Sequence, residues 1–392
     1  MLGDFDTDYT VKKWRRSGLK LLILGYIVLK NGKQKGVCLN TRKIIHIDAD
    51  CFYAAIEMRD DPSLTNIPFA VGGSPSGRGV LTTCNYPARA FGVRSAMPTA
   101  QALRLCPQLK VGPVNMVKYR EASKEMRRIF EKFTDLIEPL SLDEAYLDVS
   151  HSDLYQGSAT HMAQTIRAEI REKLGITVSA GVSSNKFIAK VASDWNKPDG
   201  LKVVTPEEID LFSAALPVKL IPGVGKVTAH KLERLGFQTC ADLREADRNK
   251  LVRRFGSFGA TLVERAWGRD DRAVNPARNR KSISVENTYA EDLENGHACF
   301  EKLSDLLVDL MLRIDKANAK NVVQKAFVKI KFNDFSSTTV EKAGTTARIS
   351  DYRELLAEGL ARKPLPVRLL GIGVRIETAG AEQLELHIPE GL

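Results

Sequence analysis

Two short acidic segments contain the residue types that metal-assisted chemistry on phosphates requires. The apolar run at 44–50 reaches Asp48 near its end, and the strand-like run at 141–148 holds Asp143 and Glu144 side by side. Adjacent carboxylates inside a strand are unfavourable unless a cation neutralises them. If the two strands are neighbours, these three carboxylates converge on one point. Three oxygen ligands suit a pair of Mg²⁺ ions placed for in-line attack on phosphorus.

The bulk composition indicates a folded protein with a polyanionic partner. The chain has 392 residues, so about two to four domains are expected. It is 43% hydrophobic and 27% charged, with a net charge of +10 that favours nucleic acid as a partner. A basic protein without a nucleic-acid role is the alternative. The six cysteines contain no Cys-x-x-Cys pair, which argues against a zinc site and fits reduced thiols in a cytoplasm.

The N-terminal segment is set apart from the rest. Its most apolar stretch, 19–29, contains Lys20 and Gly25 and is followed by Lys30. That stretch is too short to cross a bilayer, and no clean cleavage site for a signal peptide follows it. We therefore expect no membrane association and treat residues 1–42 as an extension of unknown role.

The elements that must position the carboxylates alternate between strands and helices. Pattern and turn residues predict helices at 52–59, 100–105, 119–133, 159–174 and 185–192, and strands at 67–71, 80–83, 176–182, 326–332 and 367–376. Ser183 or Ser184 is the expected cap of the helix at 185. Short helices fill 206–268, and a polar linker precedes the strands that return at 282. This mixture favours an α+β fold over a doubly wound sheet.

Four segments, in order, resemble the Y-family translesion DNA polymerases, and most closely their bacterial DNA polymerase IV group. They are the acidic runs at 44–57 and 141–148, the Cys-Asn-Tyr-Pro-Ala-Arg-Ala-Phe-Gly-Val-Arg run at 84–94, and Asn-Lys-Pro-Asp-Gly at 196–200. The similarity extends from about residue 43 to the C-terminus. The N-terminal extension departs from the family, whose members start near Lys43.

The resemblance implies a multidomain right hand. It implies a ferredoxin-like palm at 43–50 and 114–205, small fingers at 51–113, a helical thumb with a helix-hairpin-helix at 206–268, a linker at 269–281, an α+β little finger at 282–380 and a tail at 381–392.

The resemblance also assigns the active-site residues. Asp48, Asp143 and Glu144, with the carbonyl of Ala49, would bind two Mg²⁺ ions. Asp50 is left out of the ligand set. The incoming triphosphate would be held by Thr83, Tyr86, Arg89, Lys197 and the backbone amides of Cys51, Phe52 and Tyr53. Tyr53 matches the aromatic residue that excludes a ribose 2′-hydroxyl; a buried core tyrosine is the alternative.

Further residues are expected to contact DNA and a partner protein. The helix-hairpin-helix would approach phosphates through Gly223, Gly225 and Lys226. Alternation along 326–332 predicts an apolar face made of Ala326, Val328, Ile330 and Phe332. The opposite face would contact DNA phosphates through Lys325, Lys329 and Lys331, which lie beside Phe327. Arg368 and Arg375 could extend that cationic face. Gln383, Leu384 and Leu386 resemble the family's peptide for the sliding clamp, although a final structural strand is the rival interpretation.

The predicted activity is template-directed addition of dNTPs to the primer 3′-end of primer-template DNA by a cytoplasmic monomer. The resemblance implies low fidelity, translesion synthesis and no proofreading exonuclease. A two-metal nuclease, a nucleotidyl cyclase with a palm-like fold and a DNA-binding protein without catalysis are the rival functions. Extension that depends on dNTPs separates the polymerase from the nuclease.

Overall fold

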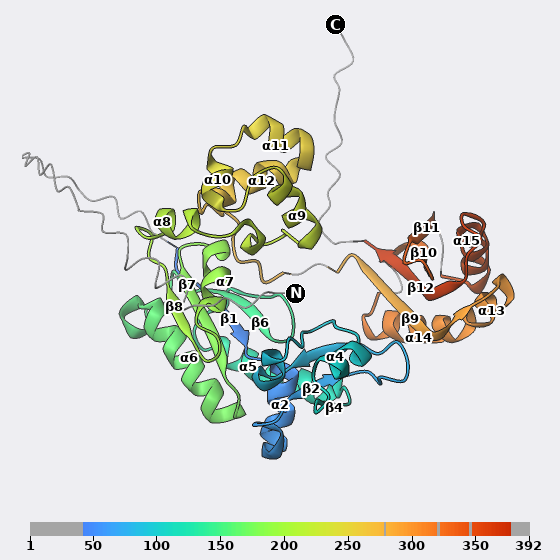
Figure 1. The fold of residues 1–392 in the computed structure, drawn as a ribbon, viewed down its shortest axis with the longest axis horizontal. Helices are drawn as coiled ribbons and strands as arrows, with labels where there is room; N and C mark the ends of the chain where they lie inside the picture. Colours follow the sequence, from blue (N-terminus) through green and yellow to red (C-terminus); the bar gives the residue numbers. More distant parts are fainter. Residues whose placement is uncertain (1–41, 278–279, 320–321, 345–346, 378–392) are drawn as a thin grey trace, which may run out of the picture. The chain divides into compact units, whose positions relative to one another are not determined.

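The computed structural model describes residues 42–277, 280–319, 322–344 and 347–377 (Figure 1). The extension at 1–41 and the tail from 378 onward, with its predicted clamp peptide, lie outside these residues. Internal contacts divide the described chain into two compact units. One contains residues 42–46, 148–168 and 179–271; the other contains residues 47–147, 169–178 and those from 272 onward.

A five-stranded sheet has the first acidic strand at its centre. It consists of β1 (Ile44–Ala49), β5 (Ile137–Pro139), β6 (Glu144–Asp148), β7 (Val178–Ser183) and β8 (Leu201–Val203), in the order β5-β6-β1-β7-β8. Ile44, Ile45 and Ile47 of β1 are fully buried, as expected for a central strand covered on both faces. The helices that belong with this sheet in sequence are α5 (Met116–Phe130), α6 (Ala159–Leu174) and α7 (Lys186–Trp195), and the short η2 (Leu154–Gly157) precedes α6.

A second, smaller sheet follows the first helix. It has three strands, β2 (Phe69–Gly72), β3 (Leu81–Cys84) and β4 (Lys110–Gly112), in the order β3-β2-β4. β2 pairs antiparallel with β3 and parallel with β4. Its helical elements are α2 (Phe52–Asp60), η1 (Pro62–Leu64), α3 (Tyr86–Ala90) and α4 (Thr99–Leu105).

Residues 206–268 form short helices around a core that they share with residues of α7 and with Val204. They are α8 (Ile209–Ala214), η3 (Val218–Leu220), α9 (Lys226–Arg234), α10 (Cys240–Arg244), α11 (Arg248–Phe255) and α12 (Ser257–Ala266). The buried residues of this cluster include Leu216, Leu232 and Leu262.

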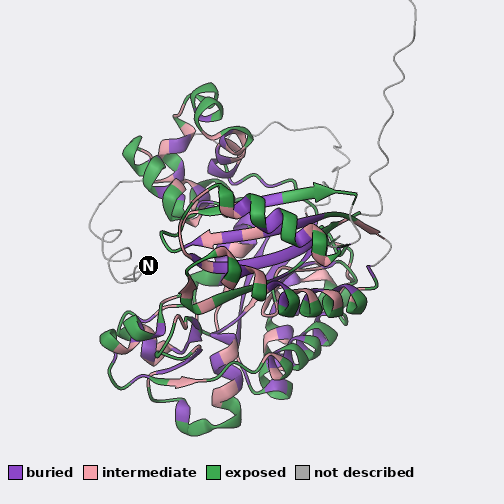
Figure 2. Ribbon diagram, turned by 90° about the vertical axis from the view of Figure 1, so that its right-hand side faces the viewer, coloured by how far each residue is buried: buried purple, intermediate pink, exposed green. Residues whose placement is uncertain are grey.

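The C-terminal region is an antiparallel sheet with two long helices on one face. Its elements are β9 (Ser282–Leu293), α13 (Gly296–Glu301), α14 (Leu303–Lys316), β10 (Val323–Phe332), β11 (Ser337–Ala343), α15 (Ile349–Ala361) and β12 (Val367–Ile376), with strand order β11-β10-β12-β9. The predicted alternation along β10 is confirmed, because Ala326, Val328, Ile330 and Phe332 belong to the buried core shared with α14 and α15. In Figure 2, buried residues concentrate in strands and on the inner sides of helices.

Three expected helix starts differ from the observed ones, and the helix predicted at 100 begins at Thr99. The helix predicted at 119 begins at Met116, because the side chain of Asn115 accepts a hydrogen bond from the backbone N–H of Lys118. The helix predicted at 185 is capped by Asn185, and neither serine is the cap. Ser183 is instead the last residue of β7, and its hydroxyl donates to the carbonyl of Val204 at 2.9 Å. None of the helices in the described part of the chain is long and apolar enough to span a membrane.

Candidate active site

The two acidic segments lie on neighbouring strands. β6 is next to β1 in the sheet, and the backbone N–H of Ala49 donates to the carbonyl of Asp143 at 2.9 Å. Asp48 is the next-to-last residue of β1, and Glu144 is the first residue of β6. The adjacency on which the predicted metal site depends is therefore present, and all three carboxylates remain partly exposed to solvent.

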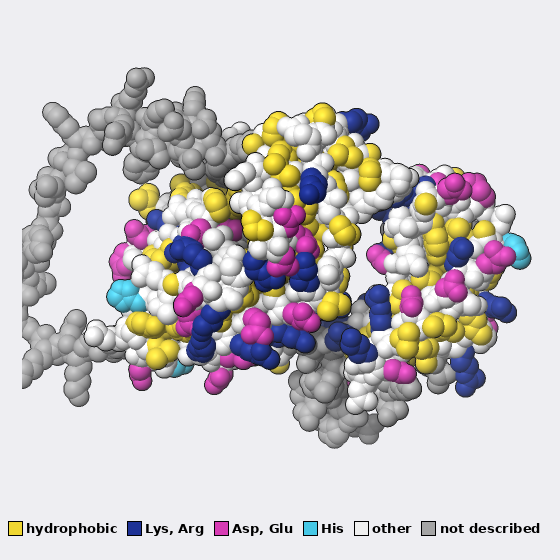
Figure 3. All heavy atoms as spheres, turned by 90° about the horizontal axis from the view of Figure 1, so that it is seen from below, with side chains coloured by type: hydrophobic (Ala, Val, Ile, Leu, Met, Phe, Trp, Pro, Cys, Tyr) yellow, Lys and Arg dark blue, Asp and Glu magenta, His cyan; other side chains and the backbone are white. Residues whose placement is uncertain are grey.

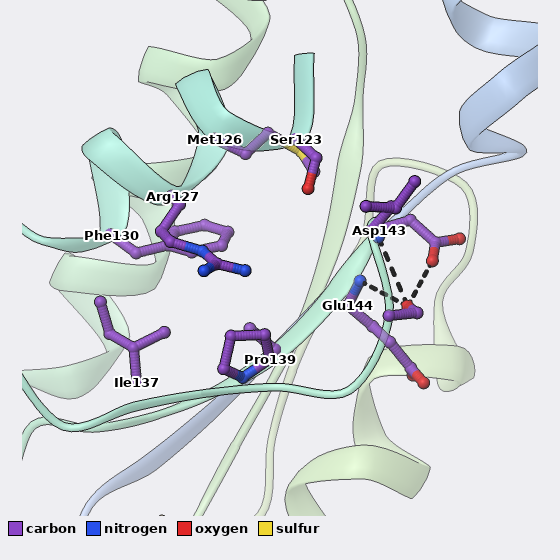
Figure 4. A pocket seen from close by; sticks show the side chains of 11 residues that line it. Ser123, Met126, Arg127, Phe130, Ile137, Pro139, Asp143 and Glu144 are labelled. Carbon is purple, nitrogen blue, oxygen red and sulfur yellow. Dashed lines mark hydrogen bonds between the residues drawn. The ribbon is translucent and has the colours of Figure 1, made fainter. Parts of the chain in front are cut away.

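A serine holds the acidic turn in place. The Ser141 hydroxyl donates to Asp143 Oδ1 at 2.5 Å and accepts from the backbone N–H of Glu144 at 3.2 Å (Figure 4). Within the described residues no group of three or more His, Cys, Asp or Glu side chains is arranged to hold a metal ion. The oxygen ligands of Asp48, Asp143 and Glu144 nevertheless have the chemistry that Mg²⁺ prefers. Their assignment as ligands stays a prediction.

Asp50 lies in the turn directly after β1 and is held there by hydrogen bonds. Its side chain is 2% exposed and accepts hydrogen bonds from Thr177 Oγ1 at 2.9 Å and from the Tyr86 hydroxyl at 3.4 Å. The carboxylate therefore connects the end of β1 with the predicted triphosphate-binding segment on α3. A structural role is what this buried, hydrogen-bonded position supports.

Backbone amides line the start of α2 directly after β1. Cys51 is the N-cap residue, with a left-handed backbone at φ 43° and ψ 46°, and Phe52 begins the helix. Both side chains are buried, whereas that of Tyr53 is partly exposed. The first N–H groups of a helix have no partner within it, so this turn has the donors that a phosphate requires.

The predicted triphosphate ligands Thr83, Tyr86 and Arg89 lie on β3 and α3. Thr83 is buried in β3, and Tyr86 is the first residue of α3. Arg89 Nε donates to the carbonyl of Cys84 at 3.2 Å, and the guanidinium carbon is 4.7 Å from the centroid of the Tyr86 ring. Arg89 and Tyr86 therefore present one joint surface, a combination that suits a polyphosphate.

The residue that fixes this segment, Asn85, is not among the predicted site residues. Asn85 is fully buried, and its Oδ1 accepts from the backbone N–H groups of Ala88 at 3.1 Å and Phe69 at 3.0 Å. An Asn directly before a helix is a cap signal, so the residue type alone could have indicated its role. Ser141 was missed as well, and its contact with Asp143 had no comparable signal.

Tyr53 lies beside a second aromatic ring and near the acidic turn. Its ring stacks on that of Tyr119, with centroids 4.3 Å apart and planes inclined by 12°. Burial raises the pKa of the Tyr53 phenol, and the negative charge of Asp143 raises it further. The position therefore combines an aromatic wall with proximity to the carboxylates.

Lys197 belongs to the other compact unit. Its Nζ is 2.7 Å from a carboxylate oxygen of Asp194, which lies in the last turn of α7. Its predicted contact with the triphosphate stays a prediction.

The predicted helix-hairpin-helix has the expected backbone. Gly223 has φ +94°, a conformation that favours glycine, and Gly225 is the N-cap of α9. Lys226 is the first residue of that helix and is exposed. Exposed amides and a lysine at a helix start suit a phosphate contact, and the contact itself stays a prediction.

The open face of the C-terminal sheet is less cationic than the sequence pattern suggested. Lys329 forms a 2.7 Å ion pair with Glu286, and Arg375 forms a 2.6 Å ion pair with Glu341. Lys331 instead lies 4.9 Å from the centroid of the Phe335 ring. Figure 3, which views the protein from below, shows Lys and Arg side chains interspersed with Asp and Glu on that side. A phosphate contact by Lys329 would therefore compete with Glu286, while Lys325 is exposed.

Comparisons with known proteins show the family to which this chain belongs. Residues 47–194 match the impB/mucB/samB family, residues 280–386 match the C-terminal domain of that family, and residues 219–270 match the thumb domain of DNA polymerase iota. A DNA polymerase IV of Pseudomonas putida is 57% identical over 354 residues, which cover 90% of this chain and 100% of the relative. The chain belongs to the Y family of DNA polymerases.

Other relatives and solved structures extend the comparison. The DNA polymerase IV of Ralstonia nicotianae is 54% identical and covers 87% of this polymerase and 95% of the relative. A Y-family DNA polymerase chimera has a TM-score of 0.77 at 27% identity and covers 85% of this chain and 98% of its own. An insertion ternary complex of the Dbh DNA polymerase has a TM-score of 0.61 at 28% identity, with coverages of 86% and 99%. The predicted right-hand α+β fold and the predicted polymerase activity are confirmed, whereas the domain limits stay predictions.

Proposed function

We propose that this polymerase extends a primer by metal-assisted phosphoryl transfer from dNTPs under the direction of a DNA template. The observation that carries the proposal is the adjacency of β1 and β6, with the Ala49 N–H bonded to the Asp143 carbonyl at 2.9 Å. It brings Asp48 and Asp143, with Glu144 beside it, to neighbouring strand ends.

The three carboxylates and the Ala49 carbonyl would hold a pair of Mg²⁺ ions. When bound, the metal pair would promote deprotonation of the primer 3′-hydroxyl and neutralise the triphosphate and the leaving pyrophosphate. The protein groups then have to position the substrate. Arg89 and Tyr86 on α3 and the amides at the start of α2 would orient the triphosphate, and Lys197 would add a point charge.

We further propose that Tyr53 is the wall that excludes a ribose 2′-hydroxyl. The ring is partly exposed, stacks on Tyr119 and lies close enough to Asp143 for that charge to raise its pKa. An aromatic side chain beneath a deoxyribose leaves no space for the extra oxygen that distinguishes RNA from DNA.

The family likeness supports the wider part of the proposal. This wider part is that the polymerase has low fidelity, copies past damaged bases in DNA repair and does not proofread. It would act in the cytoplasm as a monomer and would bind the sliding clamp through Gln383, Leu384 and Leu386. Gly223, Gly225, Lys226, Lys325 and Lys331 would contact the DNA backbone.

Primer extension with Mg²⁺ and dNTPs tests the central claim. Wild type should extend the primer, and Asp143→Ala should bind DNA without extending it. Asp153→Ala, at an exposed carboxylate in the other compact unit, is the matched control and should extend normally. Full activity of Asp143→Ala would refute the metal assignment, and a shortened primer from the wild type would indicate the nuclease instead.

A further inference from the structure

The ring stacked against Tyr53 is itself held in a fixed position. Tyr119 lies on α5 and is fully buried. Its hydroxyl donates to Glu57 Oε1 at 2.6 Å, a short bond to a charged acceptor. Tyr119 therefore has neither the space nor the hydrogen-bonding freedom to turn away from Tyr53.

Glu57 ties this contact back to the helix that carries Tyr53. The two residues are four positions apart on α2, so they occupy the same side of the helix. The second carboxylate oxygen of Glu57 lies 2.7 Å from Lys118 Nζ, and the same ammonium lies 2.9 Å from Asp60. The result is a closed arrangement in which two helices are joined by a ring stack and by an ion-paired carboxylate.

We propose that Glu57 is a positioning residue for sugar discrimination, which acts through Tyr119 on the ring of Tyr53. The inference rests on the proposed role of Tyr53 as the sugar wall. An aromatic wall excludes one oxygen atom only if its ring cannot move aside when a ribonucleotide enters. The Tyr119 ring, stacked on Tyr53, prevents that movement, and the hydrogen bond to Glu57 holds the Tyr119 ring in the stacked position.

The charge states of these groups support a permanent arrangement. Burial, followed by the hydrogen bond to Glu57, raises the pKa of the Tyr119 phenol, so the proton that it donates is retained at neutral pH. The bonds to Asp60 and Glu57 raise the pKa of Lys118, so the ammonium stays charged. Neither partner of Glu57 is lost near neutral pH.

Single-nucleotide insertion with matched dNTP and rNTP measures the effect as the ratio of the two kcat/KM values. Tyr119→Phe removes only the hydroxyl, and Glu57→Leu removes the acceptor. Each should lower the dNTP preference about tenfold, the factor expected for one hydrogen bond to a charged group. Glu57→Gln keeps an acceptor for Tyr119 and should stay within about twofold of wild type. Glu121→Gln, an exposed carboxylate on α5, is the surface control.

Tyr53→Ala, measured in parallel, separates the two levels of the inference. Loss of discrimination in Tyr53→Ala together with partial loss in Tyr119→Phe supports both. Loss in Tyr53→Ala alone, with wild-type discrimination in Tyr119→Phe and Glu57→Leu, overturns the role of Glu57 and leaves the sugar wall intact. Unchanged discrimination in Tyr53→Ala overturns both. If Glu57→Leu does not fold, Tyr119→Phe alone tests the role of Glu57, because this variant keeps the aromatic ring. If the hydrogen bond between Tyr119 and Glu57 had only a structural role, Tyr119→Phe would lower the melting temperature without changing the ratio of the kcat/KM values for dNTP and rNTP.

Discussion

Removal of the Asn85 side chain should loosen the segment that carries Tyr86 and Arg89. In Asn85→Ala, the Ala88 N–H loses its capping acceptor and the Phe69 N–H loses its side-chain acceptor. A lost cap costs about 1 kcal/mol. A buried donor left without a partner costs about 1–3 kcal/mol. We therefore expect a local destabilisation of about 3 kcal/mol, which corresponds to about a hundredfold faster exchange of the affected amides.

Asn115→Ala provides the control, because Asn115 is also a helix cap but is exposed. Its side chain accepts a hydrogen bond from the Lys118 N–H at 3.2 Å. Its loss should cost about 1 kcal/mol. Native-state hydrogen exchange of the peptide containing residues 85–92 measures the first change, and the KM for dNTP should rise in Asn85→Ala because Tyr86 and Arg89 lose their orientation. Equal exchange rates in Asn85→Ala and wild type would refute the account of the segment.

Three further outcomes follow from single contacts. Gly181→Ala should fail to fold or should melt at a lower temperature, because the new Cβ would lie 2.0 Å from the carbonyl oxygen of Ala189. Gly225→Ala is the control and should melt as wild type does, because its new Cβ would have no atom within 4 Å. Backbone hydrogen bonds from Thr239 and Gln238 lower the pKa of Asp242 in the folded protein. The ionised carboxylate therefore stabilises α10 at pH values above the ordinary pKa of 3.8, and this stabilisation is lost as the pH falls through the lower pKa of the folded state. Asp242→Asn should remove this part of the acid dependence of thermal unfolding. Burial raises the pKa of the Cys240 thiol to about 12, so the native protein should resist alkylation at Cys240 at neutral pH and lose that resistance in urea.

Local sequence determined much of this protein, because backbone preference and side-chain periodicity act over a few residues. The acidic strands, the start of α2 and the two-sided character of β10 all follow from such patterns. The same short range explains the errors. Ser183 has the right residue type for a cap, yet its hydroxyl bonds to Val204, a partner that only strand β7 and its neighbour bring close.

Tertiary structure decided which of these side chains meet. Glu286 reaches Lys329 across β12 because Gly371 stands between them; a Cβ there would lie 2.7 Å from the Cβ of Glu286. Strand register sets that ion pair, and no local pattern contains it. The stack of Tyr53 on Tyr119 likewise joins two helices through packing between distant parts of the chain. The sequence determines which residue types are available to bind a metal and a nucleotide. The orientation of their side chains, and the side chains that compete for them, are set only when the sheets and helices pack.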